Sequence, residues 1–181
     1  MSSSQKLIAA PRQLAPCIVL IGMAGAGKST VGKEIARLTG WAYVDTDHLL
    51  EAAYGVPLQH VADAFDKDTF IRAEGEMICS LKASRAVIAT GGSVVYHEAA
   101  MRHLSELGTL VHLDVPFAVI ERRIAAKPDR GLTMAPGQTL ADLFYERNPL
   151  YKGWAAFHCE TEGKSPGECA RWIVECLEGR A

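Results

Sequence analysis

The sequence predicts an α/β fold, a parallel β-sheet with helices on both of its faces. Two observations predict it. Short apolar runs typical of buried strands alternate along the chain with helical patterns, as in successive strand–helix–strand units. The first apolar run, residues 17–21, also leads through the glycine-rich segment 22–30 directly into a helical pattern, and this arrangement is typical of such sheets.

The first half of the chain contains three expected strands. In the helix expected at 28–38, Val31, Ile35 and Leu38 share one face, and Gly40 follows its end. The next apolar run closes on a pair of aspartates. The expected elements are strand 17–21, helix 28–38, strand 41–44, helices 48–54, 58–64 and 69–83, strand 86–90 and helix 98–107.

The second half adds two strands and a long polar loop. Residues 127–138 are rich in proline and glycine, and they are numerous enough to form a mobile lid. One helix opens with the cap residue Thr139 and is expected to end before Pro149. The last helix opens with a capping box that begins at Ser165. The expected elements are strand 109–115, helices 116–126 and 139–147, strand 156–161 and helix 166–177.

Two further groups of residues are expected to be buried. The apolar residues of helix 69–83 form one buried face, and Arg72 and Glu74 lie off that face. Cys17, Cys79 and Cys176 lie in apolar runs, so we expect them to be small core residues. The five cysteines include no C-x-x-C pair, which indicates neither a zinc site nor a disulfide framework.

The length, composition and charge of the chain limit the number of domains and the classes of partner that it can have. With 181 residues, of which 49% are hydrophobic and 22% charged, the sequence is typical of one soluble domain. We expect residues 1–15 to be a flexible tail and residues 16–181 to form that domain. The net charge of −2 indicates no nucleic-acid or membrane partner, and no apolar run approaches a membrane span. The cysteine usage fits a reduced, cytoplasmic setting.

The segment 22–30 has the spacing G-x-x-x-x-G-K-S of a phosphate loop. Its glycines allow backbone N–H groups to turn toward a phosphate, and the positive end of the following helix faces the same anion. Lys28 is placed to reach the β- and γ-phosphates, and the Ser29 hydroxyl is placed to ligate Mg²⁺. The nucleotide-binding residues are expected to be Gly22, Gly25, Ala26, Gly27, Lys28, Ser29 and Thr30.

Two further features follow strands and therefore belong to the same edge of the sheet. Asp45 and Asp47 close the second strand, and Gly91 and Gly92 close the third. Ligands of parallel sheets bind at the carboxyl ends of the strands, so these residues should meet the phosphate loop in one crevice. Asp45 could hold Mg²⁺ through a water, and Asp47 could accept the proton of a hydroxyl. Asp47 is equally suited to cap the helix that follows.

This combination favours a small kinase that uses ATP and Mg²⁺. A guanine-reading N-K-x-D motif, which GTP-binding switches require, is absent from the sequence. Phosphoryl transfer requires positioning and charge neutralisation more than covalent chemistry. Arg130, in the expected lid, could approach the transferred phosphoryl group on closure and exclude water, although a solvated loop charge explains the same residue.

The residues resemble the shikimate kinase family from about Pro16 onward. The resemblance rests on the phosphate loop, Asp45-Thr46-Asp47, Ala89-Thr90-Gly91-Gly92, Arg130 in the lid, and Arg147-Asn148-Pro149-Leu150-Tyr151. It implies a five-stranded sheet in the order 2-3-1-4-5 of a P-loop kinase with a mobile lid. It also implies transfer of the γ-phosphate of ATP to a ring hydroxyl of shikimate by a monomer.

The resemblance implies roles for single residues. Lys28, Asp47 and Arg130 would be catalytic, with Asp47 touching the acceptor hydroxyls. Arg123 would stack on adenine, with Lys164 on the other side of the base. Arg147 would pair its guanidinium with the substrate carboxylate, a geometry that suits this anion. The substrate-binding set is Asp47, Arg72, Gly91, Gly92, Ser93 and Arg147.

Three departures from the family pattern fall on the acceptor side. The family usually has an arginine directly after the phenylalanine that corresponds to Phe70, and this chain has Ile71 at that position. Arg72, the next residue, points about 100° away around the helix unless the register shifts by one residue. Ser93 stands where the family has a third glycine, and Gly131 follows the lid arginine where the family has proline.

These departures leave two other functions open. A smaller hydroxy acid such as homoserine would need one arginine and could use Ser93. A catalytically silent nucleotide-binding module is the alternative from another class, although Lys28, Ser29, Asp45 and Asp47 are all present.

Overall fold

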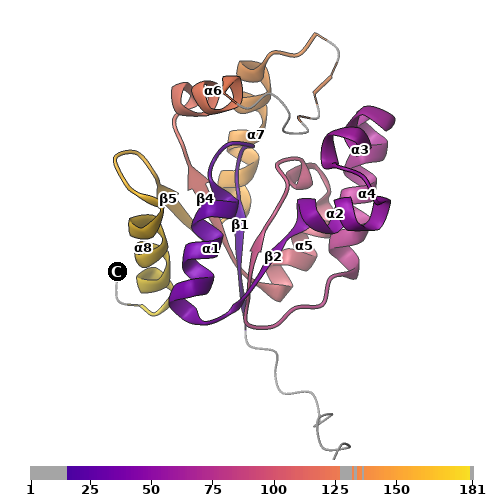
Figure 1. Cartoon of the computed structure of the whole chain (residues 1–181). Helices are drawn as coiled ribbons and strands as arrows, with labels where there is room; N and C mark the ends of the chain where they lie inside the picture. Colours follow the sequence, from indigo (N-terminus) through magenta and orange to yellow (C-terminus); the bar gives the residue numbers. More distant parts are fainter. Residues whose placement is uncertain (1–15, 127–131, 133, 136, 180–181) are drawn as a thin grey trace, which may run out of the picture.

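A five-stranded parallel sheet forms the centre of the protein (Figure 1). The computed structural model describes residues 16–126, 132, 134–135 and 137–179. The expected tail 1–15, Arg130 and most of the expected lid 127–138 lie outside the described residues. The sheet has the predicted order β2-β3-β1-β4-β5. Its strands are β1 (Cys17–Ile21), β2 (Ala42–Asp45), β3 (Ala86–Ala89), β4 (Gly108–Asp114) and β5 (Phe157–Glu160).

The central strand β1 is buried along its whole length. In the register of the sheet, Val19 is the partner of Ile88 on β3 and of Leu110 on β4. Continuous apolar runs such as this one are expected where helices cover both faces of a parallel sheet. The carboxyl ends of β1, β2 and β3 therefore lie side by side at one edge of a rigid core.

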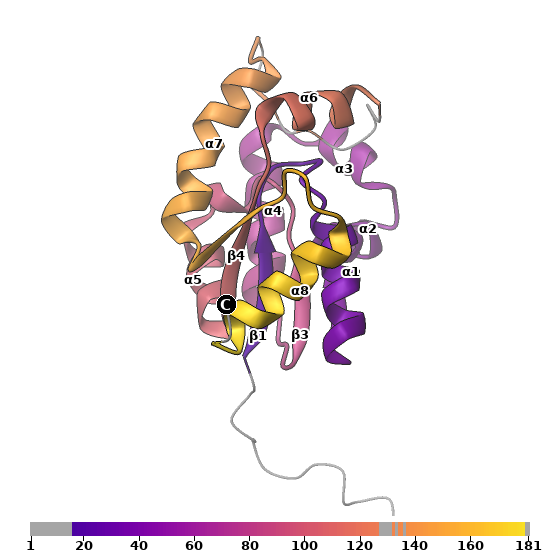
Figure 2. The same ribbon diagram turned by 90° about the vertical axis from the view of Figure 1, so that its left-hand side faces the viewer.

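Helices cover both faces of the sheet (Figure 2). Helices α1 (Lys28–Thr39) and α8 (Pro166–Leu177) lie on one face, and α5 (Glu98–Leu107) and α7 (Leu140–Trp154) lie on the other. Among the described helices, none combines the length and the apolar character that crossing a membrane would require. The remaining helical elements are α2 (Thr46–Tyr54), α3 (Leu58–Ala64), α4 (Lys67–Ser80), the 3₁₀ helix η2 (Val94–Tyr96) and α6 (Phe117–Ala125).

Helices α2, α3 and α4 lie beyond the β2 edge of the sheet (Figure 1). A small apolar cluster of Leu50, Val61 and Phe70, one residue from each helix, holds them together. This cluster is separate from the main core between the sheet and its covering helices. Helix α4 also packs on α5 and contributes Ile78 to the main core, so it ties α2 and α3 to the body of the protein beside the strand ends.

The structure corrects two helix boundaries. Pro149 lies inside α7, which continues to Trp154 instead of ending at 147. A proline inside a helix costs about 3 kcal/mol, but the last turn is anchored because Tyr151 is fully buried. The cap of α2 is Asp45 rather than Asp47, since the Asp45 side chain accepts a hydrogen bond from the Asp47 N–H and the helix starts at Thr46.

Three expectations about burial were wrong. Leu38 lies in the last turn of α1 and is 41% exposed, so the buried face of that helix ends at Ile35. Cys79 is exposed on α4, because it falls on the side of the helix that faces away from the core. Glu74, expected on the solvent side of α4, is buried. Its burial brings a carboxyl group into the interior near the strand ends.

Candidate functional site

The phosphate loop joins β1 to α1, and its backbone conformation depends on glycine. Gly22, Gly25 and Gly27 have φ angles of 142°, 80° and 98°, which side chains rarely tolerate. Lys28 lies under the loop, where its ammonium donates hydrogen bonds to the carbonyl oxygens of Gly22 at 2.7 Å and Met23 at 2.9 Å. Burial lowers the pKa of Lys28 to about 8. The loop therefore holds a cation where phosphates would arrive.

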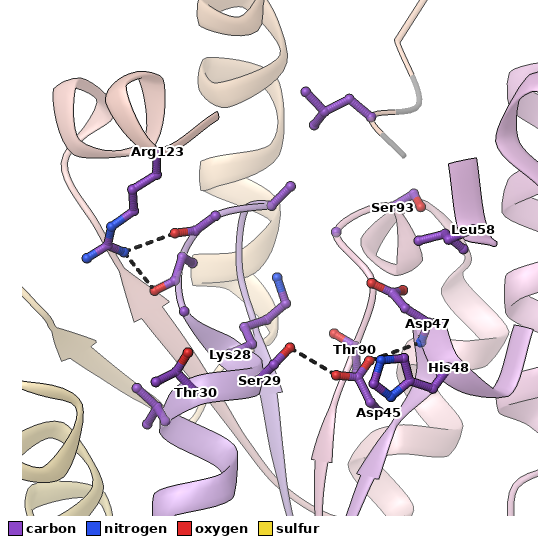
Figure 3. Close-up of a pocket in the computed structure, with 18 of the residues that line it drawn as sticks. Lys28, Ser29, Thr30, Asp45, Asp47, His48, Leu58, Thr90, Ser93 and Arg123 are labelled. Carbon is purple, nitrogen blue, oxygen red and sulfur yellow. Dashed lines mark hydrogen bonds between the residues drawn. The ribbon is translucent and has the colours of Figure 1, made fainter. Parts of the chain in front are cut away.

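Ser29 and Asp45 meet at the start of α1 and the end of β2 (Figure 3). The Ser29 hydroxyl donates to Asp45 Oδ2 at 2.9 Å, and the Tyr43 hydroxyl donates to the same oxygen at 2.8 Å. No cluster of three or more His, Cys, Asp or Glu side chains suited to a metal occurs within the described residues. A hydroxyl beside a carboxylate fits Mg²⁺, which binds through one or two protein oxygens, phosphates and water.

Asp47 and Glu74 are the acidic groups of the acceptor side. Burial raises the pKa of Asp47 to about 6, although Lys28 opposes the shift. Burial, together with the charge of Asp47, raises the pKa of Glu74 to about 7. The Oδ1 atom of Asp47 and the Oε1 atom of Glu74 both approach the position that a Cβ atom would occupy at Gly91. Gly91 therefore has no room for a side chain.

The end of β3 supplies backbone groups to the same place. The Gly91 N–H donates to the Thr46 hydroxyl at 3.0 Å. A Cβ atom at Gly92 would lie 3.2 Å from Arg147 and 3.3 Å from the Ala24 backbone nitrogen, so Gly92 separates α7 from the phosphate loop. The Tyr151 hydroxyl donates to the Gly92 carbonyl oxygen at 2.5 Å. This bond fixes the glycine pair relative to α7.

Arg147 is the buried cation of the acceptor side. Its Nε donates to the Tyr96 hydroxyl at 3.2 Å, and its guanidinium carbon lies 5.0 Å from the centre of the Tyr96 ring. The Tyr96 hydroxyl in turn donates to Glu146 at 2.6 Å. Because only 2% of Arg147 is exposed, its guanidinium has a fixed orientation in an environment where charge is weakly screened.

Arg123 and Lys164 lie on the other side of the phosphate loop. Arg123 donates from α6 to the carbonyl oxygens of Gly25 at 2.9 Å and Ala26 at 3.3 Å (Figure 3). Lys164 donates to the Glu160 carbonyl oxygen at 2.9 Å. Both residues, with Thr161, line the main cavity and also an adjoining cavity of about 370 Å³. The second cavity therefore adjoins the phosphate loop through lining residues that both cavities share.

One cavity of about 830 Å³ brings most of the predicted residues together. It is lined by the loop residues from Gly25 to Thr30 and by Asp45, Asp47, Gly91, Gly92, Ser93, Arg123, Arg147 and Lys164. Gly22 is buried at the start of the loop. Arg72 is exposed on α4 and does not line this cavity, so the structure does not bring it to the acceptor side. Arg130 lies outside the described residues.

Four residues that shape the site have no predicted role from the sequence, namely Tyr43, Glu74, Tyr96 and Tyr151, although Tyr151 belongs to the run that carries the family resemblance. Glu74 follows Phe70 by four positions, which places both on one helix face, and this spacing could have indicated its burial. Tyr151 ends the run that begins at Arg147, one turn further along the same helix face. Tyr43 lies two residues before its partner Asp45, and that spacing could have indicated the contact. No signal in the sequence marked Tyr96, since its partner Arg147 comes from a distant segment.

Comparisons with known proteins agree on one family. The family model described as "SKI: Shikimate kinase" matches residues 24–178. The shikimate kinase of Thermodesulfovibrio yellowstonii is 36% identical over 164 residues, which cover 89% of this chain and 94% of that protein. The structure titled "Shikimate kinase from Acinetobacter baumannii in complex with shikimate" aligns with a TM-score of 0.82 and 29% identity, over 91% of this chain and 94% of that one.

A second group of relatives is much longer than this chain. The human protein "Threonine synthase-like 1" is 34% identical over 165 residues, which cover 89% of this chain. The aligned part makes up only 22% of that protein. The similarity is therefore to one segment of a larger protein.

Proposed function

This chain belongs to the shikimate kinase family, and from that premise we propose that it transfers the γ-phosphate of ATP to a ring hydroxyl of shikimate. As a member of this family it is a kinase that phosphorylates a hydroxyl group. The observation that carries the proposal is one cavity in which a phosphate loop, the carboxyl group of Asp47 and the guanidinium of Arg147 converge. The homoserine and silent-module alternatives are not favoured by the comparisons.

The nucleotide binds along the phosphate loop. Lys28 exchanges its bonds to loop carbonyls for bonds to the β- and γ-phosphates, where its charge stabilises the transition state. Ser29 and Asp45 would hold Mg²⁺, which neutralises phosphate charge when it is bound. Arg123 and Lys164, which line the adjoining cavity, flank the adenine.

The acceptor binds between Asp47 and Arg147. Arg147 pairs with the carboxylate of shikimate, and the Gly92 backbone lies beside it. Asp47 accepts the proton of the reacting hydroxyl while the hydroxyl oxygen forms its bond to the γ-phosphorus. The bond from that phosphorus to the β–γ bridging oxygen breaks, and ADP leaves with the electron pair. A pKa of about 6 suits Asp47 to this task, because the carboxylate is ionised at neutral pH yet basic enough to accept a proton.

Turnover with defined acceptors tests the proposed function. ADP release is measured in Mg-ATP with shikimate or homoserine at matched concentration. Because the family model and the relatives that match this chain are shikimate kinases, we expect rapid ADP release with shikimate and background release with homoserine. Chelation of Mg²⁺ should reduce the signal to background. Turnover with homoserine alone would contradict the choice of shikimate.

Arg147→Lys tests the carboxylate site. Lysine keeps the positive charge but loses the planar guanidinium that binds a carboxylate through two parallel hydrogen bonds. We expect the KM for shikimate to rise about 10- to 100-fold, because charge-assisted hydrogen bonds are worth roughly 1.5–3 kcal/mol. The KM for ATP should not change, since Arg147 lies on the acceptor side.

The matched control for this variant is Lys152→Arg. Lys152 lies on the same helix but forms an ion pair with Asp114 at 2.9 Å, and it does not line the cavity. Its replacement should leave both KM values unchanged. An equal rise in the KM for ATP in Arg147→Lys would indicate a general distortion of the cavity and would contradict the assigned role.

Other predictions from the sequence remain proposals. We retain Arg130 as a catalytic residue of the lid, together with a monomeric, cytoplasmic protein. We assign Arg72 no contact with the substrate, because this residue is exposed outside the cavity.

A further inference from the structure

Ser93 and Glu74 form a buried pair beside the acceptor site, and the inference drawn from it rests on the function proposed above. The Ser93 hydroxyl donates to Glu74 Oε2 at 2.5 Å. Ser93 is 5% exposed and lines the main cavity, whereas Glu74 is 2% exposed and lies behind it. Glu74 Oε1 has no hydrogen-bond partner within the part of the chain that the structure describes. The pair is therefore a polar contact built into the floor of the cavity.

The pair fixes what Ser93 can offer to a ligand. A serine hydroxyl has one hydrogen to donate and two lone pairs that accept. Since the hydrogen is directed at Glu74, only the lone pairs remain for the cavity. The bond forms in both charge states of Glu74, because Oε2 accepts even when a proton occupies the unpartnered Oε1, although it is stronger to the ionised carboxylate. Ser93 therefore faces the acceptor as a hydrogen-bond acceptor and not as a donor.

The groups around the pair divide the cavity floor into two regions. Asp47 lies beside Glu74 at Gly91, so this region presents acceptor oxygens from two side chains that line the cavity, Asp47 and Ser93. Arg147 lies beyond Gly92 and supplies the positive charge of the other region. Hydroxyl groups bind where acceptors gather, and a carboxylate binds at the guanidinium.

We propose that Glu74 is a positioning residue that orients Ser93 as a hydrogen-bond acceptor, and that Ser93 thereby selects substrates carrying a hydroxyl next to the one that is phosphorylated. Ser93 thus determines specificity through a second ring hydroxyl of shikimate, in addition to the contacts of Asp47 and Arg147. The geometry requires no movement of the chain, since the Ser93 hydroxyl already lines the cavity while its hydrogen is directed at Glu74 Oε2.

Deoxy analogues of shikimate test this selection. KM is measured for shikimate and for its analogues that each lack one hydroxyl, with the wild-type protein, Ser93→Ala and the control Ser105→Ala. Ser105 is an exposed serine that donates to the Arg102 carbonyl oxygen of its own helix. In the wild type, one analogue with an intact reacting hydroxyl should show a KM about 2- to 10-fold above that of shikimate, as the loss of a neutral hydrogen bond predicts. Ser93→Ala should abolish this difference, and Ser105→Ala should retain it.

Two further variants serve as controls in case Ser93→Ala misfolds, because this substitution leaves the buried carboxyl group of Glu74 without its hydrogen-bond donor. Glu74→Leu replaces the carboxyl group with an apolar side chain and frees the Ser93 hydrogen, and the double variant Ser93→Ala/Glu74→Leu removes both polar groups. Glu74→Leu should weaken the discrimination, and the double variant should abolish it with an unchanged KM for ATP. Full wild-type discrimination in Ser93→Ala or in the double variant would overturn the proposal.

The hydrogen bond between Ser93 and Glu74 is tested without any substrate, through the pKa of Glu74. The carboxyl carbon of Glu74 is followed by NMR during a pH titration of the wild type and of Ser93→Ala. Donation by Ser93 lowers the pKa of Glu74, so its removal should raise that pKa. An unchanged value would overturn the inference. If the wild type turned over no shikimate, the proposed function would fail; turnover with unaltered selectivity in Ser93→Ala would overturn only the role of the pair.

Discussion

Lys28→Met reduces kcat for shikimate phosphorylation by about 100- to 1,000-fold, the loss expected when one preorganised group that stabilises transition-state charge is removed. Methionine fills the same space, so the loop keeps its shape while the charge is lost. Steady-state ADP release measures the effect. Lys33→Met is the matched control, because Lys33 is an exposed lysine of the same helix. A loss of less than tenfold in Lys28→Met would contradict a role in phosphoryl transfer.

The same substitution should not lower the free energy of unfolding at neutral pH. Burial lowers the pKa of Lys28 from 10.5 to about 8, so the folded protein disfavours the charged ammonium. Below pH 8 the ammonium is charged in the folded and in the unfolded protein, and burying this charge lowers the stability of the folded protein. The loss of stability is relieved as the pH rises from 8 to 10.5, where only the folded protein has released the proton. We therefore expect any stabilisation by methionine to be largest below pH 8 and to shrink above it. Urea unfolding at several pH values measures this difference.

Asp47→Asn is expected to lower kcat by about 100- to 10,000-fold, the range for loss of a general base. Asparagine has nearly the same shape but cannot accept the proton of the reacting hydroxyl. The wild-type activity should fall about tenfold per pH unit below pH 6, because protonated Asp47 is no longer a base. The variant should lack this acidic limb. A limb at pH 6 that persists in Asp47→Asn would assign the ionisation to another group.

Stability changes in the opposite direction from activity in this variant. The pKa of Asp47 is raised from 3.8 to about 6 by burial, so the folded state binds a proton more tightly than the unfolded state. The stabilisation that this provides is complete below pH 3.8 and is lost as the pH rises through 6. Above pH 6 we therefore expect Asp47→Asn to unfold at a higher temperature than the wild type. Asp63→Asn, on an exposed position of α3, is the control and should show no such gain.

The order of elements and the sheet could be predicted because their signals are local. The apolar run of β1, the capping boxes of α7 and α8, and Gly40 after α1 each specify structure within a few residues. The boundary at Pro149 could not be predicted in this way. A proline normally ends a helix, but Tyr151 is bonded to Gly92, a residue 59 positions away. Tertiary packing outweighs the local preference there.

The residues of the site show the same difference between local and long-range signals. The phosphate loop and the residues at the ends of β2 and β3 were found because their chemistry is concentrated in short motifs. Glu74 was missed because a charged residue is ordinarily placed on the solvent side of a helix. In the interior it accepts a hydrogen bond from Ser93, which lies on another segment. Pairs of this kind have no periodic signature in a sequence.

The exposed thiol on α4 offers a practical way to follow the acceptor side in solution. Of the five cysteines, Cys17, Cys159 and Cys169 are buried and Cys176 is half-buried, so a maleimide fluorophore should react first with Cys79. The same helix carries Phe70 and Glu74, which border the acceptor region. A probe attached there would report ligand arrival through its emission, at a point removed from the cavity lining.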